Sequence, residues 1–498
     1  MPIRSLSHNG VLVPPKYKAH ELSLGIGSVR IPLKPNQEEM AVAWVKKLGT
    51  EYADDEVFVR NFFRDFSDRL GIGLTKPSQV DFSEVIQLVQ DERENRAAMP
   101  RVERQALAEE RKVIRERNKE RFGYAEVDGI RMEIGNYIAE PSSIFMGRGK
   151  HPSRGKWKEG PEEKDIELNL SPDSLTPPGA WGSVSWHSDS FWVARWKDKL
   201  SGKIKYVWLS DFAVVKQQKE KEKFDLAASL EQYLQDVRNH IQLNLESTSV
   251  VRRRIATVCY LVDMLMFRVG DEENEAGTVG ASTLRPEHIK FGQENSVTFD
   301  FLGKDSIRFS KSVQLPLAVV RNLESFARET RSTVFRGVRS KPVSDFLGEM
   351  MPGLTAKVFR TYHATSAVEA YFKANPVNTS EPDYVKRHVA TMANLQAASL
   401  CNHKRKIPKT WEISLQRKEQ RLERLGNKEG KSEKNLTTAR SLMMRISESK
   451  ATKDYNLRTS LKSYIDPRTY YEWGLRVDYD WKKYYPSALQ RKFSWIEL

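Results

Sequence analysis

Cysteine is scarce in this chain, with Cys259 and Cys401 the only two among 498 residues. Neither sits in a CxxC or Cys/His spacing, so no disulfide framework and no structural zinc site is expected.

Long apolar runs are also missing. The most apolar helical segment, near 255–267, is shorter than a bilayer span and contains Asp263, and the N-terminus lacks an apolar stretch of signal-peptide length. These absences predict a soluble, intracellular protein without a membrane anchor.

The usual nucleotide and metal signatures are absent from the sequence as well. The GKDS run at Gly303 lacks the upstream glycine spacing of a phosphate-binding loop, and there is no HExxH. The acidic run 271–275 could hold a divalent ion, but a solvated turn after a helix is the preferred interpretation. We therefore expect no metal and no cofactor.

Positive charge and aromatic residues are plentiful. The 81 Lys and Arg residues outnumber 66 Asp and Glu, which gives a net charge of +15. A balance of this sign indicates a polyanionic partner, with nucleic acid ahead of an anionic membrane surface. The 39% hydrophobic residues, including 11 Trp, are enough for large cores. The length suits about three or four domains.

The first part of the chain mixes short strands with helices. Apolar spacing predicts a helix over 37–48. Dense charge over 81–120 predicts a solvated helix or helical hairpin, with a basic DNA-facing surface as the alternative. Alternation over 181–208 predicts two strands joined by a turn that contains Ser201 and Gly202.

A charge-rich stretch at 214–223 separates this part from a mainly helical one. Helices are predicted over 355–372 and 383–402. Alternating apolar residues over 297–309 predict a hairpin with Lys304 at its tip.

Two charged helices with thin apolar seams are predicted next, forming a helical hairpin over 411–455 that stands off the body. The last 43 residues regain aromatics and should dock back onto the main body. The chain is thus predicted to be an α+β, multidomain protein.

Four cationic or imidazole groups lie at the ends of apolar elements, namely Arg268, Lys304, Arg360 and His403. Each also has a purely structural explanation. Arg268 could form a salt bridge to nearby acids, and Lys304 could lie in a solvated turn. Arg360 could be a helix surface group, and His403 could cap the C-terminus of a helix. Burial of an unpaired charge is costly, however, and one anionic ligand would serve all four.

Several short motifs resemble those of the eukaryotic-type type IB DNA topoisomerases, in the same order along nearly the whole chain. Any one of them is weak, but seven in order are specific. The matching stretches are NFFRD at 61–65, GRGKHP at 147–152, KIKY at 203–206, FLGKDSIR at 301–308, LTAKVFRTY at 354–362, LCNH at 400–403 and SYIDPR at 463–468.

The resemblance implies a cap lobe and a mainly helical catalytic lobe that together clamp DNA, with a linker hairpin that tracks the DNA beyond the cut. Double-stranded DNA is the implied partner, and the implied state is a monomer. The corresponding divisions are a DNA-binding cap at 1–213, a catalytic core at 214–410, a linker at 411–455 and a C-terminal domain at 456–498.

The family's catalytic set maps onto five residues of this chain. Tyr464, which nothing else distinguishes among 17 tyrosines, would be the nucleophile that forms a 3′-phosphotyrosyl intermediate. Arg268 and Arg360 would bind the non-bridging phosphate oxygens, where planar guanidinium donors fit. His403 would add a hydrogen bond to the same phosphate, and Lys304 would protonate the departing 5′ oxygen. The ester preserves the phosphodiester energy, so neither ATP nor a metal is required.

Further family positions are implied to face DNA with little sequence preference, through phosphate or minor-groove contacts. They are Arg148, Lys150, Lys203, Lys205, Tyr206, Asp305 and Ser463. Ser463 stands where the animal enzymes carry asparagine, at a position implicated in camptothecin binding, whereas the matching acid Asp305 is retained. We therefore hypothesise reduced camptothecin sensitivity.

Two departures from the family bear on location. The long basic N-terminal tail of nuclear members is missing, and the linker is short compared with animal members. The chain resembles either the archaeal branch of the family or a shortened form of a longer protein. The expected location is the nucleoid or cytoplasm in the first case and the nucleus if the source is eukaryotic.

Two other functions stay open. A tyrosine recombinase or integrase uses much the same residues but needs specific sites and protomer assembly, against which the cap and linker argue. A non-catalytic basic DNA-binding protein would use Tyr464 as a core aromatic and the cations only to hold phosphates.

Overall fold

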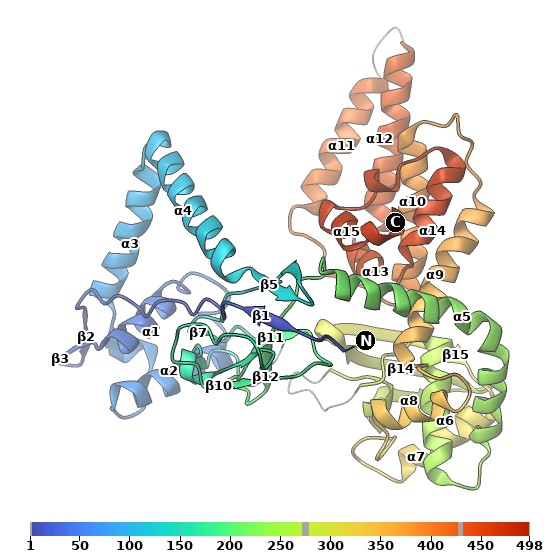
Figure 1. The fold of residues 1–498 in the computed structure, drawn as a ribbon, viewed down its shortest axis with the longest axis horizontal. Coiled ribbons are helices and arrows are strands. Elements are labelled where there is room, and N and C mark those ends of the chain that lie inside the picture. The colour runs from blue at the N-terminus through green and yellow to red at the C-terminus, as the bar shows by residue number, and fades with distance from the viewer. Residues whose placement is uncertain (1, 150, 271–277, 427–431, 498) are drawn as a thin grey trace. The chain divides into compact units, whose positions relative to one another are not determined.

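The computed structural model describes residues 2–149, 151–270, 278–426 and 432–497, apart from the side chain of Asp305. The chain divides into two compact units, Met1–Lys216 and Gln217–Leu498 (Figure 1). Both combine helices with small sheets, which confirms the predicted α+β class. The finer division into cap, core, linker and C-terminal domain stays a prediction.

In its described residues, the first unit contains four small sheets, with strand orders β1-β5-β6, β3-β2-β4, β7-β8 and β10-β9-β11-β12. In the last of these, β10 and β9 are parallel and the other neighbours are antiparallel. The strands are β1 (Leu6–His8), β2 (Ser23–Ile26), β3 (Val29–Pro32), β4 (Val80–Asp81), β5 (Tyr124–Val127), β6 (Ile130–Glu133), β7 (Ser143–Ile144), β8 (Trp157–Lys158), β9 (Ile166–Asn169), β10 (Ser183–Ser185), β11 (Trp192–Lys197) and β12 (Ile204–Trp208).

The predicted hairpin near Ser201 and Gly202 is confirmed as β11 and β12, with Trp196 opposite Lys205. Gly202 has a φ of 68°, which a glycine adopts without strain. Along β12, Tyr206 is exposed whereas Val207 is buried. The period-2 pattern seen in the sequence therefore reflects one buried and one accessible face of the sheet.

Four α-helices complete the first unit over the residues that are described. α1 and α2 pack through aromatic rings, with Trp44 stacked on Phe62 at 5.0 Å between centroids. The charge-dense region is two separate helices, α3 and α4, which lie largely exposed and meet at Pro100 (Figure 1). Because proline disfavours helix in the residue before it, the break falls at Met99. The helices are α1 (Pro35–Val45), α2 (Glu56–Leu70), α3 (Ser83–Ala98) and α4 (Arg101–Phe122).

The second unit is mainly helical and has two cores. One is built around α6 and the antiparallel sheet β13-β14-β15, and the other around α9, α10 and the C-terminal helices. The helices are α5 (Val214–Leu245), which starts just before the division, α6 (Val250–Leu265), α7 (Leu317–Arg328), α8 (Ser340–Gly348), α9 (Ala356–Ala374), α10 (Asp383–Leu400), α11 (Trp411–Gly426), α12 (Glu433–Ala451), α13 (Leu457–Ser463), α14 (Pro467–Val477) and α15 (Ser487–Lys492).

The predicted hairpin with Lys304 at its tip is confirmed. Strands β14 (Ser296–Gly303) and β15 (Ile307–Gln314) pair with Phe301 opposite Phe309, and a single 3₁₀ turn (Lys304–Ser306) joins them. The third strand, β13 (Ile289–Phe291), pairs with β14.

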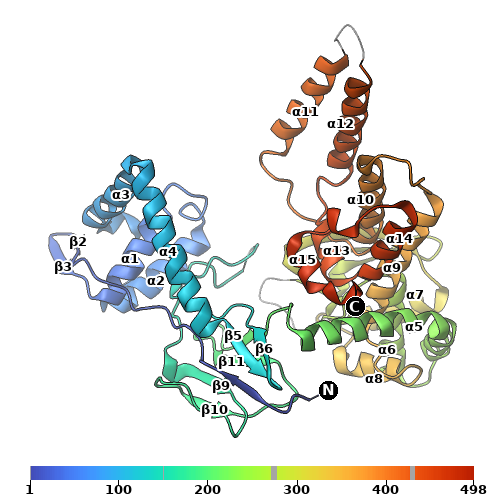
Figure 2. The same cartoon turned by 45° about the horizontal axis from the view of Figure 1, so that its top comes forward.

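Helices α11 and α12, which cover the predicted linker, project from the rest of this unit (Figures 1 and 2). They do not stand entirely apart, because α12 contacts α10 and buries Leu442 and Ile446. The predicted docking of the C-terminal aromatics is confirmed, with Trp473 of α14 stacked on Phe372 of α9 at 4.4 Å.

Candidate active site

Tyr464 follows directly after α13, and its side chain lies among three of the residues that the sequence singled out. The guanidinium carbons of Arg360 and Arg268 are 5.0 Å and 5.8 Å from the centre of its ring. The imidazole of His403 is 4.9 Å away, centroid to centroid. Tyr464 is 5% exposed. Residues from three separate segments thus converge on the phenol that a fourth segment carries.

Arg360 projects from α9 and is buried, with 4% of its surface exposed. Its guanidinium donates to the carbonyl oxygens of Met266 and Cys401, the latter at 3.0 Å. Its Nη2 lies 3.3 Å from Nε2 of His403, and its Nε has no hydrogen-bond partner within the described part of the chain. Among the residues that the structure describes, no carboxylate pairs with Arg360. A buried cation held only by neutral groups is suited to bind an anion.

Arg268 follows the end of α6. The helix stops at Met266, which takes a φ of 57°; a left-handed conformation is strained for a non-glycine residue and is characteristic of functional sites. Burial lowers the pKa of Arg268, against an opposing effect of Tyr464. The structural explanation of Arg268 was a salt bridge to the acidic run 271–275. That run lies outside the described residues.

His403 belongs to the cap of α10. The helix ends two residues earlier than predicted, at Leu400, because Asn402 has a φ of 51° and the amide of His403 donates back to the carbonyl of Ala398 at 2.8 Å. This 6→1 bond is that of a Schellman motif. Burial, together with the charges of Arg360 and Arg268, lowers the pKa of His403 to about 3. The imidazole is therefore neutral near pH 7.

Lys304 lies exposed at the tip of the β14–β15 hairpin, and Ser306 beside it has a φ of 57°. Together with Arg268, Arg360 and His403, Lys304 lines a cavity of about 110 Å³. The structure thus brings together all five residues that the resemblance selected.

The backbone of the nucleophile is held by side chains that the sequence did not reveal. Thr365 of α9 bonds the carbonyl of Tyr464 at 3.4 Å and the amide of Asp466 at 3.0 Å. Lys223 of α5 donates to the carbonyl of Ser463 at 3.3 Å, and Lys492 of α15 donates to that of Lys462 at 2.9 Å.

Burial lowers the pKa of Lys223 to about 8, against the opposing effect of Glu220. In the sequence this lysine belongs to the run 214–223, whose composition indicated only a solvated connection. No local signal marks its contact with the nucleophile segment, because the carbonyl of Ser463 is 240 residues away.

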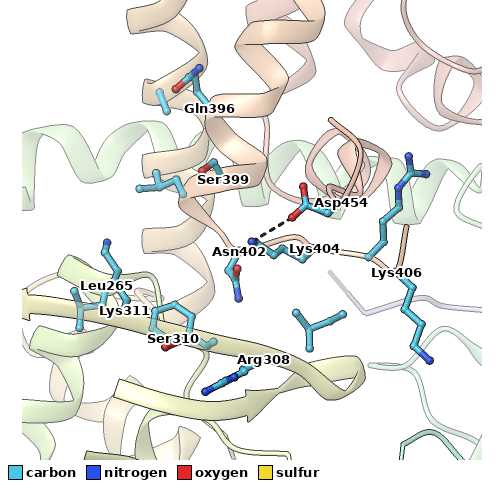
Figure 3. A pocket seen from close by; sticks show the side chains of 15 residues that line it. Leu265, Arg308, Ser310, Lys311, Gln396, Ser399, Asn402, Lys404, Lys406 and Asp454 are labelled. Carbon is cyan, nitrogen blue, oxygen red and sulfur yellow. Dashed lines mark ion pairs between the residues drawn. The ribbon is translucent and has the colours of Figure 1, made fainter. Parts of the chain in front are cut away.

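A larger cavity of about 920 Å³ adjoins the first and shares Leu400, Asn402 and Lys404 with it. Figure 3 shows side chains of β15 on one side of this cavity and those of the segment after α10 on the other. Among the described residues that line it, Asp454 is the one acid, and it pairs with Lys404 at 3.3 Å. Its cationic lining residues are Arg308, Lys311, Lys404, Arg405 and Lys406.

Several of the predicted DNA-facing residues lie in the first unit. Arg148 and Lys203 are exposed, and Lys205 lies 3.9 Å from Glu140. The ring of Tyr206 is 5.1 Å from that of Trp208 and 6.2 Å from that of Trp192.

The remaining DNA-facing candidates are only partly accounted for. Lys150 lies outside the described residues, as does the side chain of Asp305. Ser463 is in the second unit, immediately before Tyr464, where its carbonyl accepts the hydrogen bond from Lys223. The roles of all these residues stay predictions.

There is no group of three or more His, Cys, Asp and Glu side chains placed to bind a metal within the ranges that the structure describes. None of the helices in those ranges combines the length and the apolar character needed to cross a bilayer. Both cysteines are buried and unpaired.

Three family models match consecutive parts of the chain. They are described as "Eukaryotic DNA topoisomerase I, DNA binding fragment" over residues 3–209, "Eukaryotic DNA topoisomerase I, catalytic core" over 213–436 and "C-terminal topoisomerase domain" over 434–497.

Curated relatives agree with these matches. "DNA topoisomerase 1" of Candidozyma auris is 34% identical over 83% of this chain, and "DNA topoisomerase 1 beta" of Arabidopsis thaliana is 30% identical over 99%. The chain spans 57% and 58% of the lengths of these two proteins. It is also 31% identical over 99% of its length to "DNA topoisomerase I, mitochondrial" of Rattus norvegicus, of which it covers 90%.

Proposed function

The chain belongs to the eukaryotic DNA topoisomerase I family, and we propose that it relaxes supercoiled double-stranded DNA as a type IB enzyme. One strand is cut through a phosphotyrosyl intermediate, the duplex rotates about the intact strand, and the break is rejoined. The convergence of Arg268, Arg360 and His403 on the phenol of Tyr464 is the observation that supports this most directly.

In the proposed cleavage step, the phenolic oxygen of Tyr464 attacks the scissile phosphorus. A bond forms between this oxygen and phosphorus as the bond to the 5′ oxygen breaks, which leaves the phosphate on the 3′ side of the nick. The phenolic proton passes to solvent water, and the departing 5′ oxygen gains a proton from Lys304 at the rim of the cavity; solvent then reprotonates Lys304. Religation is the reverse, so the phosphodiester energy is conserved and no nucleotide is consumed.

Charge stabilisation is the proposed task of the two arginines. Negative charge grows on the non-bridging oxygens during attack, and Arg360 and Arg268 are preorganised next to the nucleophile. Arg360 in particular keeps a guanidinium Nε without a partner. Loss of either arginine is expected to slow cleavage about a hundredfold or more.

The duplex is proposed to lie against the cationic cavity next to the site, where Lys311 and Lys406 would contact phosphates. Arg148, Lys150, Lys203, Lys205 and Tyr206 of the first unit are proposed to hold the same duplex as the cap. The α11–α12 hairpin is proposed to follow the DNA beyond the cut and to slow its rotation. None of these contacts requires a second copy of the chain, so the proposed state is a monomer.

Two other activities make different predictions. A tyrosine recombinase would act only on specific sites and after protomers assemble, whereas the proposed enzyme relaxes an arbitrary plasmid as a monomer. A non-catalytic DNA-binding protein would retain all its activity when Tyr464 loses its hydroxyl.

A plasmid relaxation assay in EDTA and without ATP tests the proposal. The wild-type protein is expected to relax both negative and positive supercoils, whereas Tyr464→Phe binds DNA but neither nicks nor relaxes it. Tyr470→Phe, which removes another buried phenol, is the matched control and should keep the activity. Relaxation that needs a metal or nucleotide, or that survives in Tyr464→Phe, would contradict the mechanism.

The drug hypothesis from the sequence stays a proposal about Ser463. We expect camptothecin to trap fewer cleavage complexes in the wild type than in Ser463→Asn. Equal trapping in the two proteins would reject it.

A further inference from the structure

Both ring nitrogens of His403 have a partner within the chain. Nδ1 lies 2.8 Å from the hydroxyl of Ser460, and Nε2 lies 3.3 Å from Nη2 of Arg360. A guanidinium nitrogen only donates, so Nε2 accepts from Arg360 and carries no proton. The proton of the neutral imidazole is therefore on Nδ1, which donates to the oxygen of Ser460.

This arrangement is not the one that binds a phosphate. A phosphate oxygen only accepts hydrogen bonds, so His403 can bind one through Nε2 only when Nε2 is protonated. A doubly protonated ring is disfavoured, because burial and the charges of Arg360 and Arg268 lower the pKa of His403 to about 3. The remaining form is the other neutral tautomer, with the proton on Nε2 and a lone pair on Nδ1.

Ser460 is the group that meets Nδ1 in either form. It lies on α13, four residues before Tyr464, and is fully buried. A hydroxyl can both donate and accept, and it carries no charge. When Nδ1 loses its proton, rotation of the hydroxyl turns Ser460 from acceptor to donor, and the buried pair keeps its hydrogen bond.

We propose that Ser460 is a positioning residue that holds the ring of His403 in place while His403 exchanges its Nδ1–H tautomer for the Nε2–H tautomer on binding a DNA phosphate. One proton leaves Nδ1 and one arrives at Nε2 by exchange with solvent, so the ring is neutral before and after. Arg360 then turns its Nη2 from Nε2 to a phosphate oxygen. The inference rests on the proposed function, because it requires a phosphate at this site.

Nitrogen NMR of protein labelled with ¹⁵N-histidine measures the tautomer directly. The nine histidines are assigned by comparison with His403→Gln, and the bound state uses an uncleaved duplex on the Tyr464→Phe protein. We expect the proton on Nδ1 in the free protein and on Nε2 in the complex. A proton that stays on Nδ1 in the complex would overturn the proposal.

A double-mutant cycle on single-turnover cleavage tests the role of the serine. Ser460→Ala is expected to lower the cleavage rate about tenfold to a hundredfold, because it leaves Nδ1 buried without a partner. Ser460→Thr, which retains the hydroxyl, should recover most of that loss. In a His403→Gln background, Ser460→Ala should cost almost nothing more, since the serine acts through the histidine.

Ser67→Ala, which removes a buried hydroxyl from the first unit, is the control and should cleave at the wild-type rate. If Ser460→Ala lowers the cleavage rate by the same factor in the wild-type and the His403→Gln backgrounds, the role of Ser460 is merely structural. That result would overturn the inference. If a Ser460 variant does not fold, the NMR measurement on otherwise intact protein still decides. Relaxation by Tyr464→Phe would instead defeat the proposed function, so the two failures are distinguishable.

Discussion

His403 is neutral at physiological pH because burial and two nearby arginines lower its pKa from 6.5 to about 3. An unfolded chain takes up this proton near pH 6.5 but the folded protein does not, so stability is lost as the pH falls from 6.5 towards 3. We predict that the His403 ring resonances do not titrate between pH 5 and 8 in the DNA-free protein. A midpoint near 6.5, like that of a solvated histidine, would contradict the burial-based account of the site.

Lys223 and Lys492 hold the two carbonyls that precede the nucleophile. Replacement of Lys223 by Met should let the Tyr464 segment shift and slow single-turnover cleavage about tenfold, since small misplacements of a reacting group are costly. The affinity for DNA at fixed salt should stay the same. Lys221→Met, on the exposed side of α5, is the control. A cleavage rate for Lys223→Met equal to that of Lys221→Met would show that Lys223 does not position the nucleophile.

The five catalytic candidates were found from the sequence only through the order of the family motifs. Taken alone, Arg360 resembled a helix surface group, yet it is buried and contacts carbonyls 94 and 41 residues away. The supporting side chains Thr365, Lys223 and Ser460 were missed. Each acts through hydrogen bonds to a distant segment, and such bonds have no signature in local composition.

At the scale of elements, Asp263 connects three helices. Its carboxylate accepts from Arg238 of α5 and lies 2.7 Å from Nε2 of His363 on α9. Burial acts to raise the pKa of Asp263, but the hydrogen bonds from His363 and Arg238 outweigh it and the pKa is lowered. The contact between Asp263 and His363 thus holds α6, which precedes Arg268, against α9, which carries Arg360.

Asp263→Asn is expected to lower the free energy of unfolding by about 1 to 3 kcal/mol, because it leaves buried donors poorly paired. Cleavage should slow because Arg268 and Arg360 are no longer held in position relative to each other. Thermal melts and single-turnover assays measure the two effects, with Asp345→Asn, an exposed acid on α8, as control. Indistinguishable melts of the two variants would refute this role of Asp263.

Backbone contacts next to the active site join the segment before α11 to the segment after α12. Lys404 and Tyr455 form an isolated antiparallel β-bridge. Two backbone hydrogen bonds flank it. The amide of Arg405 donates to the carbonyl of Asp454 at 2.7 Å, and the amide of Asn456 donates to the carbonyl of His403 at 2.6 Å. The chain therefore returns to the site whether or not the hairpin is present.

Deletion of residues 411–451, with a short glycine-serine connection, should leave the cleavage rate within about threefold of wild type, because no group near Tyr464 is removed. It should change the number of rotations per cleavage event, measured with single supercoiled molecules. Loss of cleavage in a folded deletion variant would show that the hairpin supports the site directly.

Long, strongly patterned elements were predictable from the sequence, whereas boundaries set by backbone conformation were not. The β14–β15 hairpin and α9 follow from the spacing of apolar residues. The end of α10 was misplaced by two residues, because an asparagine rather than a glycine takes the left-handed conformation at its cap. The charged region was predicted as one solvated helix or a helical hairpin, and the structure has the second form, with α3 and α4 meeting at Pro100.

At the scale of the whole molecule, the net charge of +15 predicts DNA binding that weakens steeply with salt. Each phosphate contact adds about 0.9 to the slope of log affinity against log salt concentration. Replacement of both Lys311 and Lys406 of the larger cavity by Gln should therefore reduce that slope by roughly 2.

Lys341→Gln is the control for this measurement, because it removes an exposed charge from α8 and should leave the slope unchanged. Fluorescence anisotropy with a labelled duplex, repeated over a series of salt concentrations, gives the slopes. Equal slopes for the wild type and the double variant would place the duplex away from the larger cavity.

The account depends most on covalent attack by Tyr464, and a suicide substrate measures it directly. In such a duplex the strand beyond the cut is too short to stay paired, so cleavage cannot be reversed. We predict a denaturant-stable adduct with the wild type, in which mass spectrometry places the 3′ phosphate on Tyr464, and no adduct with Tyr464→Phe. An adduct on another residue, or on a 5′ phosphate, would contradict the account.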